Sequence, residues 1–159
     1  MTYWRLYYHL VWATKHREPL IDHEIEMLVQ RSFRATCHDL RVVVHAIGAM
    51  PDHVHLAVSI PPNIAISDAA RRLKGSASHL INATGERGFT FGWQPEFGVL
   101  SFGERHLPDV VGYVDNQPAR HAAGRLWATM EPGILGPPSK TDPKGPDTQE
   151  RMLPHKTSD

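Results

Sequence analysis

The stretch Pro51-Asp52-His53-Val54-His55-Leu56 decides how the rest of the chain is interpreted. Two histidines flank one apolar residue, and Val58 and Ile60 continue the alternation. Because successive side chains of a strand point to opposite faces, the apolar residues would face a core while His53 and His55 stand side by side on the other face. Two neutral imidazoles placed in this way can share one divalent cation. The simpler alternative is a half-exposed strand in which two polar positions happen to be histidine.

Length and composition limit the classes of protein to be considered. The chain has 159 residues, enough for one domain with a proper core, and its hydrophobic fraction of 41% is ordinary for a globular protein. Seventeen basic residues balance seventeen acidic ones, so no bulk positive charge indicates a nucleic-acid binder. The single cysteine, Cys37, excludes an intramolecular disulfide and a multi-thiolate zinc site, and its amphipathic surroundings favour a buried structural thiol. Without an apolar run of membrane-spanning length or a signal peptide, we expect a cytoplasmic protein.

The first sixty residues predict a strand, a helix and two further strands. Alternation of apolar and polar residues predicts a first strand over residues 3–14 and a second over residues 41–48. Between them, apolar residues recur at helical spacing after Asp22, a plausible N-cap, and this helix is expected to end near Leu40. The short connection over residues 48–52 predicts an antiparallel hairpin into the strand that carries the two histidines.

The following segment predicts a second helix and a fourth strand. Ser67 is the expected cap of the helix, and Gly85 and Gly88 break it. A connection rich in glycine and aromatic residues then leads to a strand over residues 98–102.

A third helix is predicted over residues 108–117. Pro108 suits its first turn, and Tyr113 and Gln117 lie four residues apart, hence on one face. Pro118 disfavours helical geometry at Gln117, so this end of the helix is expected to be distorted.

The chain is expected to divide into a domain over residues 1–131 and a Pro-rich disordered tail over residues 132–159. Pro, Gly, Ser, Thr and Lys dominate the second segment, and apolar periodicity is lost there.

Two basic clusters are candidates for contacts with phosphate. Lys15 begins a short basic turn, and Arg71, Arg72 and Lys74 form the densest positive patch, on the predicted second helix. The alternative is that both are simply solvated surface.

The predicted order of elements is strand, helix, strand, strand, helix, strand and an added helix. This is an α+β fold, the ferredoxin-like split βαβ arrangement, with an antiparallel sheet and two helices on one face. The two helices would cover the face that carries Val54 and Leu56. His53 and His55 would then point to the open face, where the added helix could bring Tyr113 and Gln117 to a bound metal.

Four blocks of sequence together resemble one known family. They are His9-Leu10-Val11-Trp12-Ala13-Thr14-Lys15, Met50-Pro51-Asp52-His53-Val54-His55-Leu56, Arg71-Arg72-Leu73-Lys74-Gly75-Ser76 and Tyr113-Val114-Asp115-Asn116-Gln117. In this order and at this spacing they resemble the single-tyrosine HUH transposases of small bacterial insertion sequences, relatives of the REP-associated tyrosine transposases. The resemblance covers roughly residues 3–121.

The resemblance implies a metal-dependent transposase that cleaves and rejoins single-stranded DNA. By the match, Tyr113 is the nucleophile that forms a 5′-phosphotyrosine intermediate. His53, His55 and Gln117 match the metal ligands, and the cofactor would be a divalent ion, Mg or Mn. The ferredoxin-like fold and the added C-terminal helix that bears the tyrosine also agree with the family.

The resemblance further implies the partners of the protein. It implies single-stranded DNA with hairpins at element ends, and a homodimer whose subunits share active sites, in the cytoplasm of a bacterium and with no role for a membrane. Lys15, Arg71, Arg72 and Lys74 are the candidates for DNA binding. The neutral overall charge departs from what such an enzyme is expected to have.

Three other functions compete with the transposase. The main alternative is a non-catalytic protein, derived from such a transposase, that binds hairpin or single-stranded DNA. The second alternative is a metal-dependent phosphoesterase. It would use water and would not form the covalent adduct expected of the transposase. A cupin also carries His-x-His on a strand, but it needs a glutamate a few residues later, and residues 57–67 contain no acidic residue.

Overall fold

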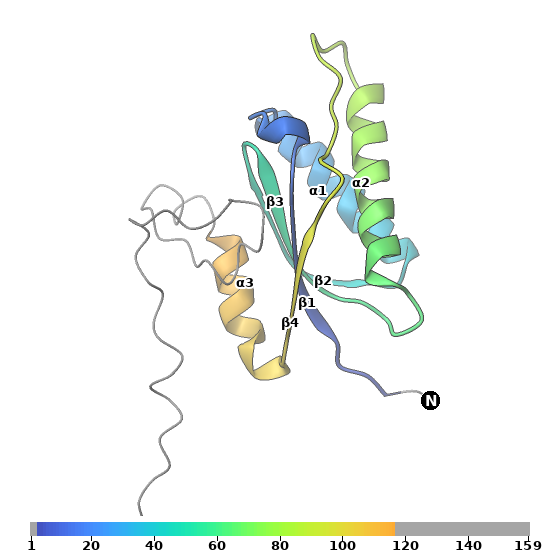
Figure 1. The fold of residues 1–159 in the computed structure, drawn as a ribbon, viewed down its shortest axis with the longest axis vertical. Helices are drawn as coiled ribbons and strands as arrows, with labels where there is room; N and C mark the ends of the chain where they lie inside the picture. The colour runs from blue at the N-terminus through green and yellow to red at the C-terminus, as the bar shows by residue number, and fades with distance from the viewer. Residues whose placement is uncertain (1–2, 117–159) are drawn as a thin grey trace, which may run out of the picture.

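The structure is a computed structural model that describes residues 3–116. The order of its elements confirms the predicted one (Figure 1). The elements are β1 (Tyr7–Ala13), the 3-10 turn η1 (Lys15–Arg17), α1 (His23–Asp39), β2 (Val43–Met50), β3 (His53–Ser59), α2 (Ile66–Ala83), β4 (Gly98–Phe102), the 3-10 turn η2 (Glu104–His106) and α3 (Leu107–Asp115). The predicted domain boundary at residue 131 and the predicted tail lie outside the described residues.

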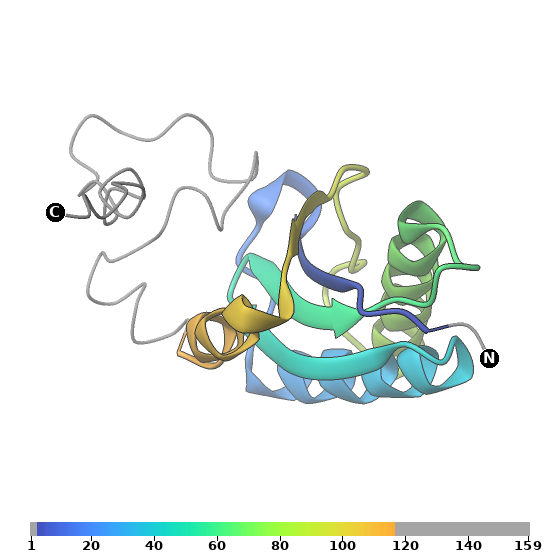
Figure 2. The same ribbon diagram turned by 90° about the horizontal axis from the view of Figure 1, so that it is seen from below.

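A four-stranded antiparallel sheet with the strand order β2-β3-β1-β4 forms the centre of the fold. Helices α1 and α2 pack together on one side of the sheet, and α3 stands apart from this pair on the other side (Figures 1 and 2). This arrangement confirms the predicted ferredoxin-like split βαβ fold with an added helix. The sheet therefore separates a core under two helices from a face covered by α3.

The main core lies between the sheet and the α1–α2 pair. Trp12 is fully buried there and makes edge-to-face contacts with Phe33 and Trp93, at ring-centroid distances of 5.5 and 6.2 Å. Cys37 is also buried in this core, and burial raises the pKa of its thiol to about 11. The thiol is thus protonated at neutral pH, which agrees with the predicted structural role.

No helix within residues 3–116 is both long enough and apolar enough to cross a membrane.

Two helix starts show where local sequence rules hold and where packing overrides them. Asp22 caps α1 as predicted, since its carboxylate accepts a hydrogen bond from the backbone N–H of Ile25 at 2.8 Å. The predicted cap of α2 is wrong. That helix begins at Ile66, which packs against the main core, so Ser67 falls inside the first turn and Ala65 occupies the cap position.

The first strand is shorter than predicted because its neighbours are short. β1 begins at Tyr7, which pairs with Phe102 at the end of β4, whereas the alternation predicts a start at residue 3. β3 reaches only as far as the pairing of Val58 with Tyr8. Within the described residues, the chain before Tyr7 therefore has no adjacent strand with which to form a ladder.

A glycine on β2 allows α3 to lie close to the sheet. α3 packs through a small cluster of buried apolar side chains that includes Ala46 and Ala57 from the sheet and Val114 from the helix. A Cβ atom added at Gly48 would lie 2.5 Å from the carbonyl oxygen of Val114 and 3.3 Å from its Cγ1. The carbonyl oxygen of Val114 is a backbone atom and cannot move aside without moving the helix. The close approach of α3 to the sheet therefore requires glycine at position 48.

We expect Gly48→Ala to loosen α3 selectively. The added methyl group should cost about 1–3 kcal/mol of native-state stability through overpacking, with faster amide hydrogen exchange in residues 107–116. Gly112→Ala is the matched control on α3 itself. Its Cβ would meet nothing within 4 Å, and alanine should stabilise the helix by about 0.5–1 kcal/mol. Unchanged exchange of α3 in Gly48→Ala would contradict the role given to this glycine.

Candidate active site

The two histidines of β3 lie on the face of the sheet that α3 covers. His53 and His55 are 1% and 0% exposed, and their ring centroids are 5.0 Å apart. Val54 and Leu56, between and after them, belong to the main core on the other face, so the predicted alternation is confirmed. The alternative of a half-exposed strand is wrong, because every residue of β3 is buried.

Tyr113 reaches this pair of histidines from α3. Its ring contacts that of His55 edge-on at a centroid distance of 6.0 Å, and it contacts the ring of His9 in the same way at 6.1 Å. The tyrosine is fully buried. Three of the residues singled out in the sequence, His53, His55 and Tyr113, thus come together within one chain.

Gln117, the fourth of these residues, lies outside the described part of the chain. α3 ends at Asp115, two residues earlier than predicted, and Asn116 closes its last turn. The backbone N–H and the side-chain amide of Asn116 both donate to the carbonyl of Gly112, at 3.1 and 2.7 Å. Pro118 disfavours continuation of the helix, which explains the early end.

His9 belongs to the site although it is not among the predicted site residues. Its Nε2 lies 2.9 Å from Nδ1 of His55, and the two rings stack with centroids 5.2 Å apart. The alternation of the first strand already places His9 on this face. The predicted fold makes β1 and β3 neighbours, but the sequence does not reveal the register that brings the two imidazoles into contact.

Asp52 connects His53 to a guanidinium group. Its Oδ1 lies 2.6 Å from Nδ1 of His53, and its Oδ2 accepts hydrogen bonds from Nη2 and Nε of Arg17 at 2.9 and 3.2 Å. The pKa of Asp52 is lowered to about 2, chiefly by the hydrogen bond from His53. Burial alone would raise this pKa, and the charge of Arg17 lowers it further. Since an ionised carboxylate only accepts hydrogen bonds, Nδ1 of His53 carries the proton.

This proton placement suits a metal ligand. In a neutral imidazole, a proton on Nδ1 leaves the lone pair on Nε2, and a carboxylate on the far nitrogen is the usual companion of a histidine that binds a metal. Among residues 3–116, no three His, Cys, Asp or Glu side chains gather in a way that could hold a metal ion. The imidazole pair fits a divalent ion as part of a donor set, with the remaining ligands of another kind.

The turn that supplies Arg17 has a strained backbone. His16 and Arg17 have φ angles of 57° and 54°, in the left-handed region that residues other than glycine rarely adopt. Each such residue costs on the order of 1–3 kcal/mol. Lys15, at the start of the turn, is exposed to solvent, as a contact to phosphate would require.

The basic residues of α2 divide into two groups. Arg71 and Arg72 are exposed. Lys74 instead donates to the backbone carbonyls of residues 94, 95 and 96, at 3.0, 2.9 and 2.7 Å. Burial lowers the pKa of Lys74. Its three ammonium hydrogens are used to hold the loop before β4, so the geometry favours a structural role over the predicted role in DNA binding.

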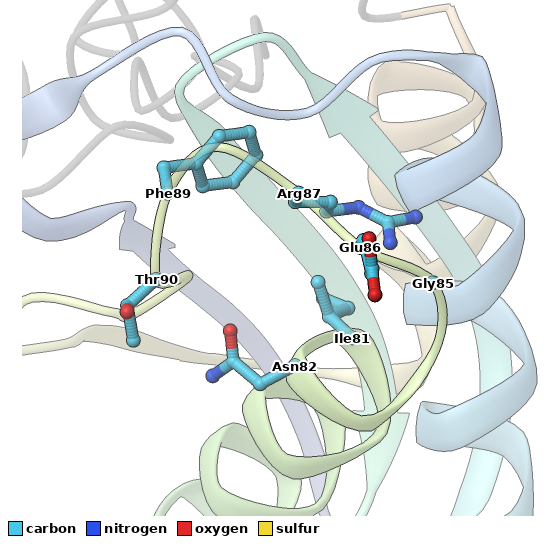
Figure 3. A pocket seen from close by; sticks show the side chains of 7 residues that line it. All are labelled: Ile81, Asn82, Gly85, Glu86, Arg87, Phe89 and Thr90. Carbon is cyan, nitrogen blue, oxygen red and sulfur yellow. The ribbon is translucent and has the colours of Figure 1, made fainter.

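A pocket of about 500 Å³ lies away from the histidines, between the end of α2 and the loop that follows it. Figure 3 shows Asn82 and Ile81 of α2 lining it together with residues of that loop, including Arg87 and Phe89. Arg87 forms an ion pair with Glu24 of α1 at 2.8 Å, and both polar groups of Asn82 bond to the backbone of Phe91. None of the predicted site residues lines this pocket.

Comparisons with known proteins agree with this arrangement. The family described as IS200-like transposases matches residues 2–117. The chain is 29% identical to the ISDra2 transposase TnpA of Deinococcus radiodurans over 72% of its length and 85% of that protein. It is 30% identical to the IS200 transposase of Salmonella typhimurium over 50% of its length, and spans 53% of that relative.

Two solved structures have the same fold. The crystal structure of a candidate transposase from Deinococcus radiodurans has a TM-score of 0.57 and 27% identity, and the match covers 74% of this chain and 95% of that one. A REP-associated tyrosine transposase bound to a REP hairpin has a TM-score of 0.58 and 18% identity, with 79% and 76% covered. With the family match spanning all the described residues, the chain belongs to the IS200-like transposases, a family of DNA strand transferases, and the resemblance seen in its motifs is confirmed.

Proposed function

We propose that this protein is a metal-dependent transposase that cleaves and rejoins single-stranded DNA with Tyr113 as nucleophile. The observation that carries the proposal is the contact of the Tyr113 ring with His55, at a centroid distance of 6.0 Å, on the face of the sheet that also bears His53. A tyrosine used only for packing would not need a cluster of buried imidazoles beside it. Membership of the IS200-like transposases supports the same chemistry.

In the proposed reaction the phenolic oxygen of Tyr113 attacks a backbone phosphorus. The bond from phosphorus to the 3′-oxygen breaks as the tyrosine ester forms, so the 5′-phosphate becomes attached to the enzyme. The phenol loses a proton and the departing oxygen gains one, which leaves a free 3′-hydroxyl. Attack by a 3′-hydroxyl on the phosphotyrosine reverses the step and rejoins strands, because the ester conserves the energy of the broken bond.

We assign His53 and His55 as metal ligands, with Gln117 as the third. Two imidazoles and an amide oxygen accept Mg or Mn, and nitrogen donors favour Mn over Mg. The bound ion would polarise the scissile phosphate and offset the charge that develops on it. The protein contributes the orientation of the two rings, since Asp52 engages Nδ1 of His53 and His9 engages Nδ1 of His55.

Access to Tyr113 requires movement of α3. The tyrosine is fully buried against its own chain's histidines, so a DNA phosphate reaches its hydroxyl only if the helix shifts relative to the sheet. The small contact between α3 and the sheet, around Gly48 and Val114, suits such a movement. In the homodimer that we propose, the same movement would let the helix of one subunit serve the histidines of the other.

We propose hairpin-bearing single strands as the substrate, bound in the cytoplasm of a bacterium. A structural relative of this chain is bound to a REP hairpin, and the fold is shared. Lys15, Arg71 and Arg72 are exposed and offer positive charge to phosphates. We do not assign Lys74 to this surface, because its ammonium group holds residues 94–96.

We expect the protein to form a covalent adduct with single-stranded DNA that depends on Tyr113 and on a divalent ion. The experiment uses labelled hairpin-bearing strands, including the DNA that flanks the gene, with Mn²⁺ and a denaturing gel. The wild-type protein should give a shifted band, and Tyr113→Phe and His53→Ala should give none. Phenylalanine keeps the ring that packs against His55, so the absence of a band would report on the hydroxyl.

Tyr3→Phe is the control, because Tyr3 is exposed and lies outside the site. A band that persists in Tyr113→Phe would contradict the choice of nucleophile. Tight, metal-independent retention of the same strands without any band would contradict the enzyme and leave the non-catalytic hairpin binder. Cleavage without an adduct would indicate a phosphoesterase that uses water.

We also expect the two groups of basic residues on α2 to behave differently. Arg71→Ala/Arg72→Ala should weaken binding of single-stranded DNA and reduce the slope of log affinity against log salt by about 0.7 for each phosphate that is no longer neutralised. Thermal stability should hardly change, since both side chains are exposed. Lys74→Ala should instead destabilise the fold by about 1–3 kcal/mol, because the hydrogen bonds from the charged ammonium group to the loop are lost. Equal effects of both variants on the salt slope would contradict the division.

A further inference from the structure

We propose that Arg17 is a positioning residue of the metal site, which acts through Asp52 to fix the tautomer and orientation of His53. The inference rests on the proposed role of His53 as a metal ligand. Arg17 itself would touch neither the metal nor DNA at the reacting phosphate.

The contacts form a continuous chain from the surface to the buried imidazole. The guanidinium group of Arg17 gives two hydrogen bonds to Oδ2 of Asp52, at 2.9 and 3.2 Å, and Oδ1 of the same carboxylate lies 2.6 Å from Nδ1 of His53. The side chains are 33%, 26% and 2% exposed, in that order. The two carboxylate oxygens are therefore divided between a partner at the surface and a partner inside the site.

The backbone holds this chain of contacts in place. β1 pairs with β3 so that Ala13 lies opposite His53, which brings Thr14 beside Asp52. The backbone N–H of Thr14 donates to the carbonyl of Asp52 at 2.9 Å, and its hydroxyl donates to the carbonyl of Glu18 at 2.6 Å. The turn that carries Arg17 and the turn that carries Asp52 are thus fastened together.

The left-handed conformations of His16 and Arg17 indicate that the position of the guanidinium matters. A turn of residues with negative φ angles could connect β1 to α1. Here two consecutive non-glycine residues have positive φ angles, which strain the backbone, and Arg17 is hydrogen-bonded to Asp52. An ion pair this exposed adds little to stability on its own. A carboxylate held against the far nitrogen of a metal ligand, in contrast, commonly changes metal affinity by about 10- to 100-fold.

The test measures Mn²⁺ affinity and the tautomer of His53 separately. In metal-free wild-type protein, ¹⁵N spectra of the histidine rings should show the proton of His53 on Nδ1. Arg17→Ala should mix the tautomers and weaken Mn²⁺ binding, measured by calorimetry, by about tenfold, and Asp52→Asn should weaken it at least as much. Arg17→Lys should restore part of the affinity, because an ammonium group can still donate to Oδ2.

Arg31→Ala, an exposed arginine on α1, is the matched control and should leave both readouts unchanged. A lower melting temperature of Arg17→Ala with an unchanged tautomer and Mn²⁺ affinity would reduce Arg17 to a structural role and overturn the proposal. Tighter Mn²⁺ binding would also overturn it, since the guanidinium charge would then oppose the metal. If the wild-type protein bound no Mn²⁺, the proposed function would fail, while the tautomer would still report on the link from Arg17 to His53.

Discussion

The antiparallel pairing of β1 with β3 is the constraint on which the rest of this structure depends. Its register sets Ala13 against His53 and Val11 against His55, so that one end of the pair joins the turn of residues 14–18 to Asp52. The same pairing brings His9 to His55. Slipping the register by one residue would turn both β3 histidines into the core under α1 and α2, and burying unsatisfied imidazoles there would be costly.

Much of the fold could be predicted because its signals are local. Alternation, helical periodicity and the Asp22 cap identify the order of the strands and helices, and the faces of β3 follow from parity alone. The misplaced Ser67 cap and the overlong first strand fail for one reason. Both depend on tertiary neighbours, namely the packing of Ile66 on the core and the ends of the adjacent strands. The sequence of one segment does not predict where a neighbouring strand ends.

The candidate site could be predicted only in part, for related reasons. His53, His55 and Tyr113 are identifiable from motifs, and the fold brings them together. His9 and Arg17 come from segments whose contribution depends on register and on an unusual backbone turn, neither of which periodicity reports. Lys74 shows a converse limit, because a basic residue on a helix suggests a charged surface, and the sequence does not show that its ammonium group bonds to three carbonyls.

The site combines residues of the central sheet with a residue of one short helix. On β3, each of the two histidines has its Nδ1 engaged, His53 by a carboxylate and His55 by another imidazole, and both are buried in a hydrogen-bonded strand. On the other side, Tyr113 sits on a nine-residue helix held by a small apolar cluster. If Tyr113 is the nucleophile, as we propose, it has to receive a DNA strand and later carry it, and this division would serve that role. The proposed ligands lie in a strand that is paired on both sides, whereas α3 meets the sheet only through the side chains of one short helix.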